Sequence, residues 1–259
     1  MSEGNNLSPI FVIILNWNLA EETIVCVQSV QHAIHAASQP ARILIVDNGS
    51  KDDSVSRFQS AFGESVAIIE TGHNLGFAGG MNAGMRQALE AGAGSVLLLN
   101  NDTVVDEEMI RILFRAAIQS KGRSIVSPFI YYFDAPQTVW KIGDRETCWL
   151  PIPLNIDAEA VTLKEEEPFA VDYVTGCCML VPRLVLQQVG LFDERFFMYF
   201  EDADFCRRVR NAGFQLSVVP QAKMWHKVSL SAKKDRACQR YWRTWGRVHF
   251  YLQHSLGMF

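Results

Sequence analysis

This sequence lacks long apolar runs, a leader pattern and an excess of basic residues. Apolar runs such as Ile10–Leu15 and Val96–Leu99 fall far short of the roughly 20 residues that a membrane-spanning helix needs. The polar residues 1–9 lack the charged-then-apolar pattern of a secretory leader, so we expect a flexible start to a cytoplasmic protein. The net charge of -4 argues against nucleic-acid binding, because nucleic-acid-binding proteins usually carry a basic face.

The six cysteines lack the spacing of a zinc site, and two of them, Cys177 and Cys178, are adjacent, which suits a structural disulfide poorly. We therefore expect small buried thiols in a reducing compartment. Internal repeats and low-complexity tracts are absent as well. The composition, 49% hydrophobic and 20% charged, is that of a globular chain that can bury a sizeable core without disulfides.

Short apolar runs alternate with helical periodicity through the first hundred residues. The runs Ile10–Leu15, Ile43–Val46, Val66–Ile69 and Val96–Leu99 have the continuous apolar character of strands that are buried on both faces of a sheet. Helices are predicted between them, the first of them capped by Asn18. This alternation predicts an α/β fold with a doubly wound, mainly parallel sheet flanked by helices.

Polar or glycine-rich clusters follow each of these strands, at Asn16–Asn18, Asp47–Ser50, Gly72–Asn82 and Asn100–Asp102. Ligands of such sheets bind beyond the carboxyl ends of the strands, so we expect the clusters to face one cleft. The loop predicted over Gly72–Gly80 lacks G-x-G-x-x-G spacing and follows the third strand, which makes it weak evidence for a dehydrogenase. A loop that approaches a ligand and a plain tight connection remain alternatives for it.

The second half of the chain is less regular. Its predicted elements are a helix over Met109–Ile118, a surface excursion or extended segments over residues 133–169, a strand over Val171–Val181, a helix from Pro182 to Gly190, a helix over Asp202–Asn211 and a strand over Gln215–Val219. The aromatic and basic tail, Gln239–His254, predicts one amphipathic helix.

Candidate functional side chains stand where the predicted cleft would open. Asp47 and Asp102 follow strands, where an aspartate is more often a turn former or a helix cap. Three carboxylates within Glu201–Asp204 follow the aromatic run Phe196–Phe200 and begin a helix, where acidic residues also stabilise the helix dipole. His226, near a strand end, is either a metal ligand or a histidine with a local partner.

Eight segments, taken in order, resemble signatures of family 2 glycosyltransferases, in the rhamnosyltransferase-like branch. They are Val12–Asn18, Val46–Ser50, Asn74–Asn82, Leu98–Thr103, Asp172–Gly176, Gly190–Glu194, Phe196–Asp204 and His226-Lys227. The resemblance covers residues 10–230 and implies a GT-A fold, inversion at the anomeric carbon and a divalent cation, Mn²⁺ or Mg²⁺.

The resemblance also implies roles for individual residues. Asp202 would be the general base, with Glu201 beside it in the catalytic pair. Asp102 stands where the D-x-D metal motif ends, and it would bind the cation with His226, although Asn100 replaces the first acidic residue. The implied donor-binding residues are Asn16, Trp17, Asn18, Asp47, Gly49, Asn74, Gly76, Phe77, Gly79, Gly80, Asn82, Asn101 and Asp102. The implied acceptor-binding residues are Gly176, Tyr199 and Asp204.

The expected organisation is one GT-A domain over residues 10–230, with a nucleotide-sugar-binding half (10–104) and an acceptor and catalytic half (105–230), followed by an amphipathic tail (231–259). The expected activity is inverting transfer of one sugar, rhamnose-like or a hexose, from a dTDP or UDP carrier. The acceptor would be a hydroxyl of a glycan or a lipid-linked acceptor in cell-surface polysaccharide synthesis. The Q-x-x-R-W signature of processive synthases is absent, which favours transfer of a single sugar.

Two other functions stay open at this point: a non-catalytic module that binds nucleotide sugars, and a sugar-phosphate nucleotidyltransferase. The latter should carry a basic, glycine-rich first loop, whereas Asn16–Asn18 is neither. The tail has two interpretations as well. Its aromatic residues, interleaved with arginines, either contact the inner face of a membrane or a lipid acceptor, or pack on the domain.

Overall fold

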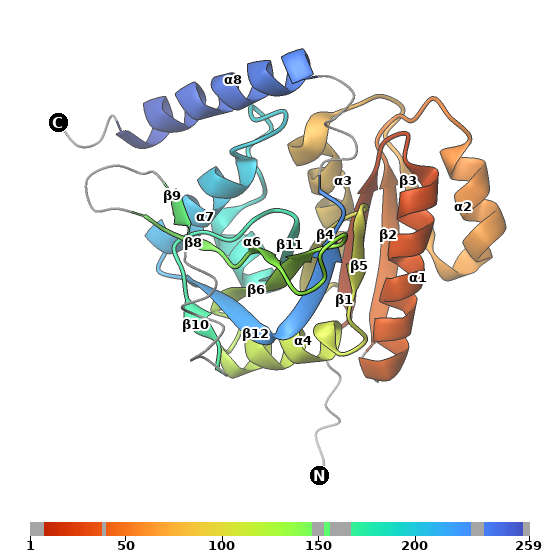
Figure 1. Ribbon diagram of the computed structural model, residues 1–259, viewed down its shortest axis with the longest axis horizontal. Coiled ribbons are helices and arrows are strands. Elements are labelled where there is room, and N and C mark those ends of the chain that lie inside the picture. The colour runs from red at the N-terminus through yellow and green to blue at the C-terminus, as the bar shows by residue number, and fades with distance from the viewer. Residues whose placement is uncertain (1–7, 38–39, 147–152, 156–166, 229–235, 256–259) are drawn as a thin grey trace, which may run out of the picture.

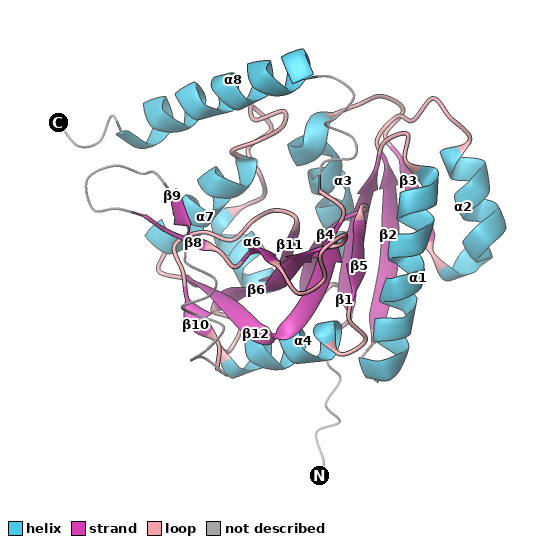
Figure 2. Ribbon diagram, viewed as in Figure 1, coloured by secondary structure: helices cyan, strands magenta, loops and turns pink. Residues whose placement is uncertain are grey.

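The computed structural model has one ten-stranded mixed sheet with helices on both faces (Figures 1 and 2). It describes residues 8–37, 40–146, 153–155, 167–228 and 236–255. Most of the start that was predicted to be flexible, and parts of the excursion predicted over residues 133–169, lie outside these ranges. Among the described residues, no helix is long and apolar enough to cross a membrane.

Four parallel strands form the first half of the sheet, and all four were predicted. They lie in the order β3-β2-β1-β4, with bounds β1 (Ile10–Asn16), β2 (Ala41–Asp47), β3 (Ala67–Glu70) and β4 (Ser95–Asn100). Because these strands are parallel, Asn16, Asp47 and Asn100 end at the same edge of the sheet, beyond which ligands bind in such folds.

The second half of the sheet continues from β4 through an antiparallel strand, β11 (Cys178–Pro182), to β6 (Ser124–Tyr132). The strand β12 (Gln215–His226) runs parallel to β6, so its carboxyl end reaches the same edge as that of β4. Shorter strands complete the set: β5 (Thr103–Val105) and β10 (Phe169–Ala170) pair with β12, β7 (Val139–Lys141) pairs with β6, and β8 (Asp144–Glu146) with β9 (Pro153–Asn155) forms a separate hairpin.

Several strand predictions need correction. The strand predicted over Gln215–Val219 is longer, because β12 continues to His226. The strand β6 was missed; Pro128 interrupts its apolar run, and a proline argues against a central strand because it lacks the N–H. Val219 of β12 pairs with Pro128 and Lys223 pairs with Phe129, so the register of β12 shifts between Val219 and Lys223. The irregularity therefore falls beside Pro128, which has no N–H to donate to the ladder. The strand predicted over Val171–Val181 begins only at Cys178, and the N–H of Gly176, in the segment before it, donates to Asp202 of α7 (Glu201–Asn211).

Seven α-helices of the described chain flank the sheet, together with a 3₁₀ turn, η1 (Gly63–Ser65). They are α1 (Ala20–Ala37), α2 (Ser54–Phe62), α3 (Gly76–Glu90), α4 (Met109–Gln119), α6 (Arg183–Val189), α7 (Glu201–Asn211) and α8 (Arg236–Ser255). The glycine-rich segment Gly72–Gly80 was predicted to be a loop, but α3 already begins at Gly76.

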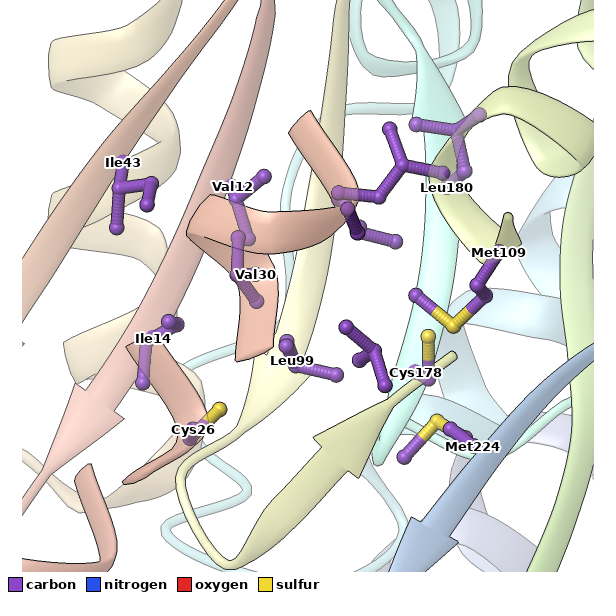
Figure 3. Close-up of a cluster of buried hydrophobic side chains, with 14 of the residues drawn as sticks. Val12, Ile14, Cys26, Val30, Ile43, Leu99, Met109, Cys178, Leu180 and Met224 are labelled. Atoms are coloured by element: carbon purple, nitrogen blue, oxygen red, sulfur yellow. The ribbon is translucent and has the colours of Figure 1, made fainter. Parts of the chain in front are cut away.

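Alternating residues of β1 divide the core into two layers. Val12 and Ile14 belong to a buried cluster with side chains of α1, α2 and α4, part of which is drawn in Figure 3. Phe11 and Ile13 belong to a second cluster with side chains of α3, α6 and α7. Each face of the sheet is thus covered by helices, which is why the strands read as continuous apolar runs.

Candidate active site

A chain of buried polar side chains joins the ends of β1, β2 and β4. The Asn16 Nδ2 donates to Asp47 Oδ1 at 2.8 Å, and its Oδ1 accepts from the Thr23 hydroxyl at 2.9 Å. The Asn101 Nδ2 donates to the same hydroxyl at 2.9 Å. The structure thus brings together three predicted donor-binding residues. Asp47 is only 3% exposed, and its second oxygen accepts from the backbone N–H of Ser50.

The loop after β1 carries Trp17 and Asn18. Trp17 is 43% exposed at this edge of the sheet, which leaves its indole free for a ligand. Asn18 has a φ of 54° and does not cap α1 as predicted. Its Oδ1 instead accepts from the backbone N–H of Lys51 at 2.7 Å, and its own N–H donates to Ser50, so Asn18 fastens the first loop to the second.

The glycines predicted to bind the donor permit close contacts within the protein. Gly76 has a φ of 75°, and a Cβ there would overlap the carbonyl oxygen of Phe197. The Phe77 N–H donates to that same oxygen at 2.7 Å, which ties the start of α3 to the segment before α7. A Cβ on Gly49 would lie 2.5 Å from the backbone of His73. Only glycine fits these two positions.

The remaining residues of this segment also face other parts of the chain. A Cβ on Gly79 would meet Leu75, and one on Gly80 would meet Leu15 of β1. The Asn74 Oδ1 accepts from the Gly76 N–H and from Asn48. Asn82 is 1% exposed, and both ends of its amide bond the backbone of Phe192, so it is not part of the cluster at the strand ends.

The two predicted metal ligands meet, although 124 residues separate them. His226 ends β12 and Asp102 follows β4, and the Nε2 of His226 lies 3.0 Å from the Oδ1 of Asp102. Both residues are buried, at 5% and 6% exposure. The Nδ1 of His226 has no hydrogen-bond partner, and Trp140 packs edge-on against the ring at 4.5 Å. The described residues hold no group of three or more metal-ligating side chains.

The predicted base, Asp202, lies in the first turn of α7 and accepts three hydrogen bonds. Its Oδ2 accepts from the Tyr173 hydroxyl at 2.7 Å and from the Gly176 N–H at 2.9 Å, and its Oδ1 accepts from the Ala203 N–H. Burial raises the pKa of Asp202 above its ordinary value, and these three bonds oppose that rise. The residue as a whole is half-buried.

Glu201 stands beside Asp202 in different surroundings. It is 6% exposed, and its Oε2 has no hydrogen-bond partner. Burial raises the pKa of Glu201 well above its ordinary value, and the negative charge of Asp202 adds to the rise. The adjacent carboxylates are therefore distinct: one is held by three donors, and the other is poorly compensated.

A short path of contacts connects Asp202, the predicted base, to Asp102, one of the two predicted metal ligands. Gly176 bonds Asp202, and the carbonyl of the next residue, Cys177, accepts from the N–H of Asn100, two residues before Asp102. Burial raises the pKa of the Cys177 thiol well above its ordinary value, and the charges of Asp102 and Asp202 both contribute. Both carboxylates thus lie within electrostatic range of one thiol.

Of the predicted acceptor-binding residues, Gly176 contacts Asp202, the predicted base. A Cβ there would be 3.2 Å from the Phe77 ring and 3.4 Å from the Asp202 Cβ. Tyr199 has a φ of 68°, and its hydroxyl accepts from Gln239 of α8. Asp204 is fully buried.

Asp204 accepts hydrogen bonds from three side chains. Arg208 pairs with one oxygen at 2.7 Å, while His254 and Gln253 of α8 reach the other at 2.8 and 3.1 Å. The acceptor-binding role predicted for Asp204 has no support in this arrangement. The carboxylate joins α7 to α8 instead.

Tyr173 is the main site residue to which the sequence assigned no role. It lies in the segment Asp172–Gly176, which resembles a family signature, but that resemblance implied no role for the tyrosine. Desolvation raises its pKa well above the ordinary value, and the neighbouring Asp202 adds to the rise, so the hydroxyl stays a hydrogen-bond donor. Thr23 and Trp140 were missed too, because each acts only through contacts that the fold creates.

A family model described as glycosyltransferase like family 2 matches residues 8–247. A low-salt glycan biosynthesis hexosyltransferase of Haloferax volcanii is 30% identical over 211 residues, which cover 81% of this chain and 64% of that relative. An N-acetylglucosaminyl-diphospho-decaprenol L-rhamnosyltransferase of Mycobacterium tuberculosis is 30% identical over 220 residues, covering 78% of this chain and 71% of the relative. A dTDP-rhamnosyl transferase of Shigella flexneri is 25% identical over 195 residues, covering 73% of this chain and 61% of the relative.

Among solved structures, the crystal structure of GalNAc-T7 with UDP, GalNAc and Mn²⁺ superposes with a TM-score of 0.69 at 16% identity. The match covers 86% of this chain and 44% of that one, and it confirms the predicted GT-A fold. The family match covers most of the chain, and its relatives include rhamnosyl- and hexosyltransferases, as expected from the sequence. The chain therefore belongs to the family 2-like glycosyltransferases.

Proposed function

We propose that this chain transfers one sugar, with inversion, from a dTDP- or UDP-sugar to a hydroxyl group of a glycan or lipid-linked acceptor. The observation that carries the proposal is the carboxylate of Asp202, which accepts hydrogen bonds from Tyr173, Gly176 and Ala203 on the same side of the sheet as the meeting of Asp102 and His226. A glycosyltransferase needs a base for the acceptor and charge compensation for its leaving group, and these two groups supply one each.

Asp202 performs the proton transfer in this mechanism. The acceptor hydroxyl gives its proton to the carboxylate while its oxygen forms a bond to the anomeric carbon. The bond from that carbon to the diphosphate oxygen breaks in the same displacement, so the configuration inverts. A pKa raised by burial makes Asp202 a better proton acceptor at neutral pH than an ordinary aspartate. The Tyr173 and Gly176 donors fix which way the carboxylate faces.

Asp102 and His226 would hold a divalent cation. The pair fits this role, because the Nε2 of His226 and the Oδ1 of Asp102 face each other and Mg²⁺-type ions are often held by one or two protein ligands plus substrate phosphates. When bound, the cation offsets the charge of the diphosphate as a Lewis acid. Mn²⁺ or Mg²⁺ is the expected ion, and the structural relative GalNAc-T7 was crystallised with UDP and Mn²⁺.

The donor would lie over the ends of β1, β2 and β4. In this arrangement residues 10–104 form the nucleotide-sugar-binding half and residues 105–230 the acceptor and catalytic half. Trp17 is exposed enough to stack on a base, while Asp47 and Asn16, which are buried and bonded to each other, would lie beneath the nucleotide. The names of the mycobacterial and Shigella relatives, a lipid-linked rhamnosyltransferase and a dTDP-rhamnosyl transferase, favour a rhamnose donor and a lipid-linked acceptor.

Thermal shift with dTDP-, UDP- and GDP-sugars, each with and without Mn²⁺, tests the donor site. One donor should raise the free energy of unfolding by about 2.7 kcal/mol at a hundred times its dissociation constant. Asp102→Asn preserves the shape of the side chain beside His226 and should lose the Mn²⁺-dependent part of that gain. An undiminished gain in Asp102→Asn would refute the metal assignment. Donor binding without transfer to any acceptor would instead favour a non-catalytic binding module.

A further inference from the structure

The two faces of α8 have different surroundings. Its inner face covers the segment Phe196–Phe200, with Trp242 stacked on Phe197 at 4.5 Å and Phe250 against Phe200 at 5.8 Å. A Cβ on Gly246 would come within 2.6 Å of the Tyr199 carbonyl, so helix and segment touch through their backbones. Of the two interpretations of the tail, packing on the domain holds for this inner face.

The outer face carries an apolar stripe. Four of the eight exposed large hydrophobic side chains of the described chain lie on α8, and they follow helical spacing: Tyr241 (59% exposed), Trp245 (48%), Val248 (51%) and Leu252 (56%). Such a continuous apolar surface is typical of a contact site rather than of scattered surface residues.

The charge of α8 identifies a surface that would match this stripe. Arg240, Arg243 and Arg247 are exposed beside it. The helix contains no aspartate or glutamate, although the whole chain has a net charge of -4. A basic helix with an aromatic and aliphatic stripe suits the interface of an anionic bilayer, where the stripe enters the headgroup region and the arginines meet lipid phosphates. A second copy would present the same positive charge and be repelled.

The position of α8 relates this surface to the site. The segment that α8 covers continues directly into Glu201 and Asp202, and it contacts the start of α3 through Gly76. Figure 1 shows α8 lying across α7 on the outside of the fold. A bilayer that contacts α8 would therefore hold a lipid-linked acceptor at the same side of the molecule as the base.

We propose that the outer face of α8, formed by Tyr241, Trp245, Val248 and Leu252 with the neighbouring arginines, docks on anionic phospholipid and places the site next to a lipid-linked acceptor. The acceptor part of this inference rests on the proposed function, whereas lipid docking does not. The helix would lie in the plane of the interface, because its inner face remains packed on Phe196–Phe200.

Vesicle flotation of the full chain tests the docking. The protein should float with vesicles of phosphatidylcholine and phosphatidylglycerol, less with pure phosphatidylcholine, and less at high salt. Trp245→Ser with Leu252→Ser should weaken partitioning at least about tenfold. Arg240→Gln with Arg247→Gln should weaken it about fivefold per arginine on anionic vesicles alone. Ile118→Ser, at a residue of equal exposure (50%) on α4, is the control and should bind like the wild type.

Val248→Ser with Leu252→Ser provides a second variant, since neither side chain takes part in the aromatic contacts with the body of the protein. Failure of the wild type to float, equal loss in the Ile118 control, or a concentration-dependent dimer formed through α8 would overturn docking. Transfer to a detergent-dispersed acceptor separates the two proposals. The docking variants should keep that activity, whereas a wild type that floats but transfers no sugar would refute the proposed function and leave docking intact.

Discussion

Asp202 and Glu201 are neighbours in the chain, but their carboxyl groups have different hydrogen-bond partners. Tyr173, Gly176 and Ala203 compensate the charge of Asp202, so it can ionise despite its burial. Glu201 lacks a partner for its Oε2. Groups whose surroundings differ in this way usually have different roles at an active site, and here only Asp202 has the donors that keep a base charged and oriented.

Asp202→Asn should lower sugar transfer by about 10²–10⁴-fold, mainly in kcat, because the amide cannot accept the acceptor proton. The substitution is nearly isosteric, so the donor dissociation constant measured by calorimetry should stay close to that of the wild type. Glu201→Gln is the matched control and should retain more activity. Near-normal turnover in Asp202→Asn, or an inactive Glu201→Gln, would require the roles to be exchanged.

Glu201→Gln should also change how stability depends on pH. Because the folded pKa of Glu201 is raised, its protonated form is favoured in the folded state, and that stability is present below the unfolded pKa of about 4.3 and lost as pH rises to the folded value. Within that window the wild type should lose up to about 1.4 kcal/mol per pH unit relative to Glu201→Gln. Urea unfolding across pH 4 to 8 measures this, and a constant difference between the two proteins would contradict it.

At the scale of elements, α7 and α8 depend on one buried carboxylate. Asp204 holds Arg208 within α7 and also His254 and Gln253 from α8. Since α8 covers the segment that leads into Asp202, this contact should stabilise the turn that carries Asp202 as well as the helix. Asp204, which was predicted to bind the acceptor, therefore joins two helices of the protein.

Asp204→Ala should cost about 3 kcal/mol of unfolding free energy, because it leaves Arg208 and His254 without their buried partner. Limited proteolysis should then release α8 faster than in the wild type. Glu21→Gln is a suitable control, because its ion pair with Arg57 is surface-exposed (71% for the glutamate) and should contribute less than about 1 kcal/mol. Equal stability and equal protease resistance in Asp204→Ala would exclude a clamp between the helices.

At the scale of the whole molecule, local patterns were sufficient where the chain is regular. The four apolar runs of the first half became β1 to β4. The strands β1, β2 and β4 are mostly buried, whereas β3 lies at the edge of the sheet and is half-buried or exposed. The strand β6 escaped prediction because Pro128 breaks its pattern, and only the irregular pairing with β12 explains how the proline fits. The helix cap predicted at Asn18 is wrong, because the side chain of Asn18 accepts a hydrogen bond from Lys51 in another loop.

The candidate site could be proposed from the sequence in part. Single residues such as Asp102 and His226 carried little signal alone, and the order of motifs along the chain identified them together. Contacts across long separations, such as Tyr173 with Asp202 or Asp204 with α8, could not be predicted, because no local pattern records which partner a side chain meets in the folded state.

The place of β11 has a consequence for how the chain is assembled during synthesis. This strand lies between β4 and β6 at the centre of the sheet, yet it follows both of them in the sequence. The ribosome therefore delivers the two neighbours before the strand that joins them, and each has an unpaired edge in the meantime. A chain that stops before Cys178 leaves the facing edges of β4 and β6 without their shared partner, in what would become the middle of the protein.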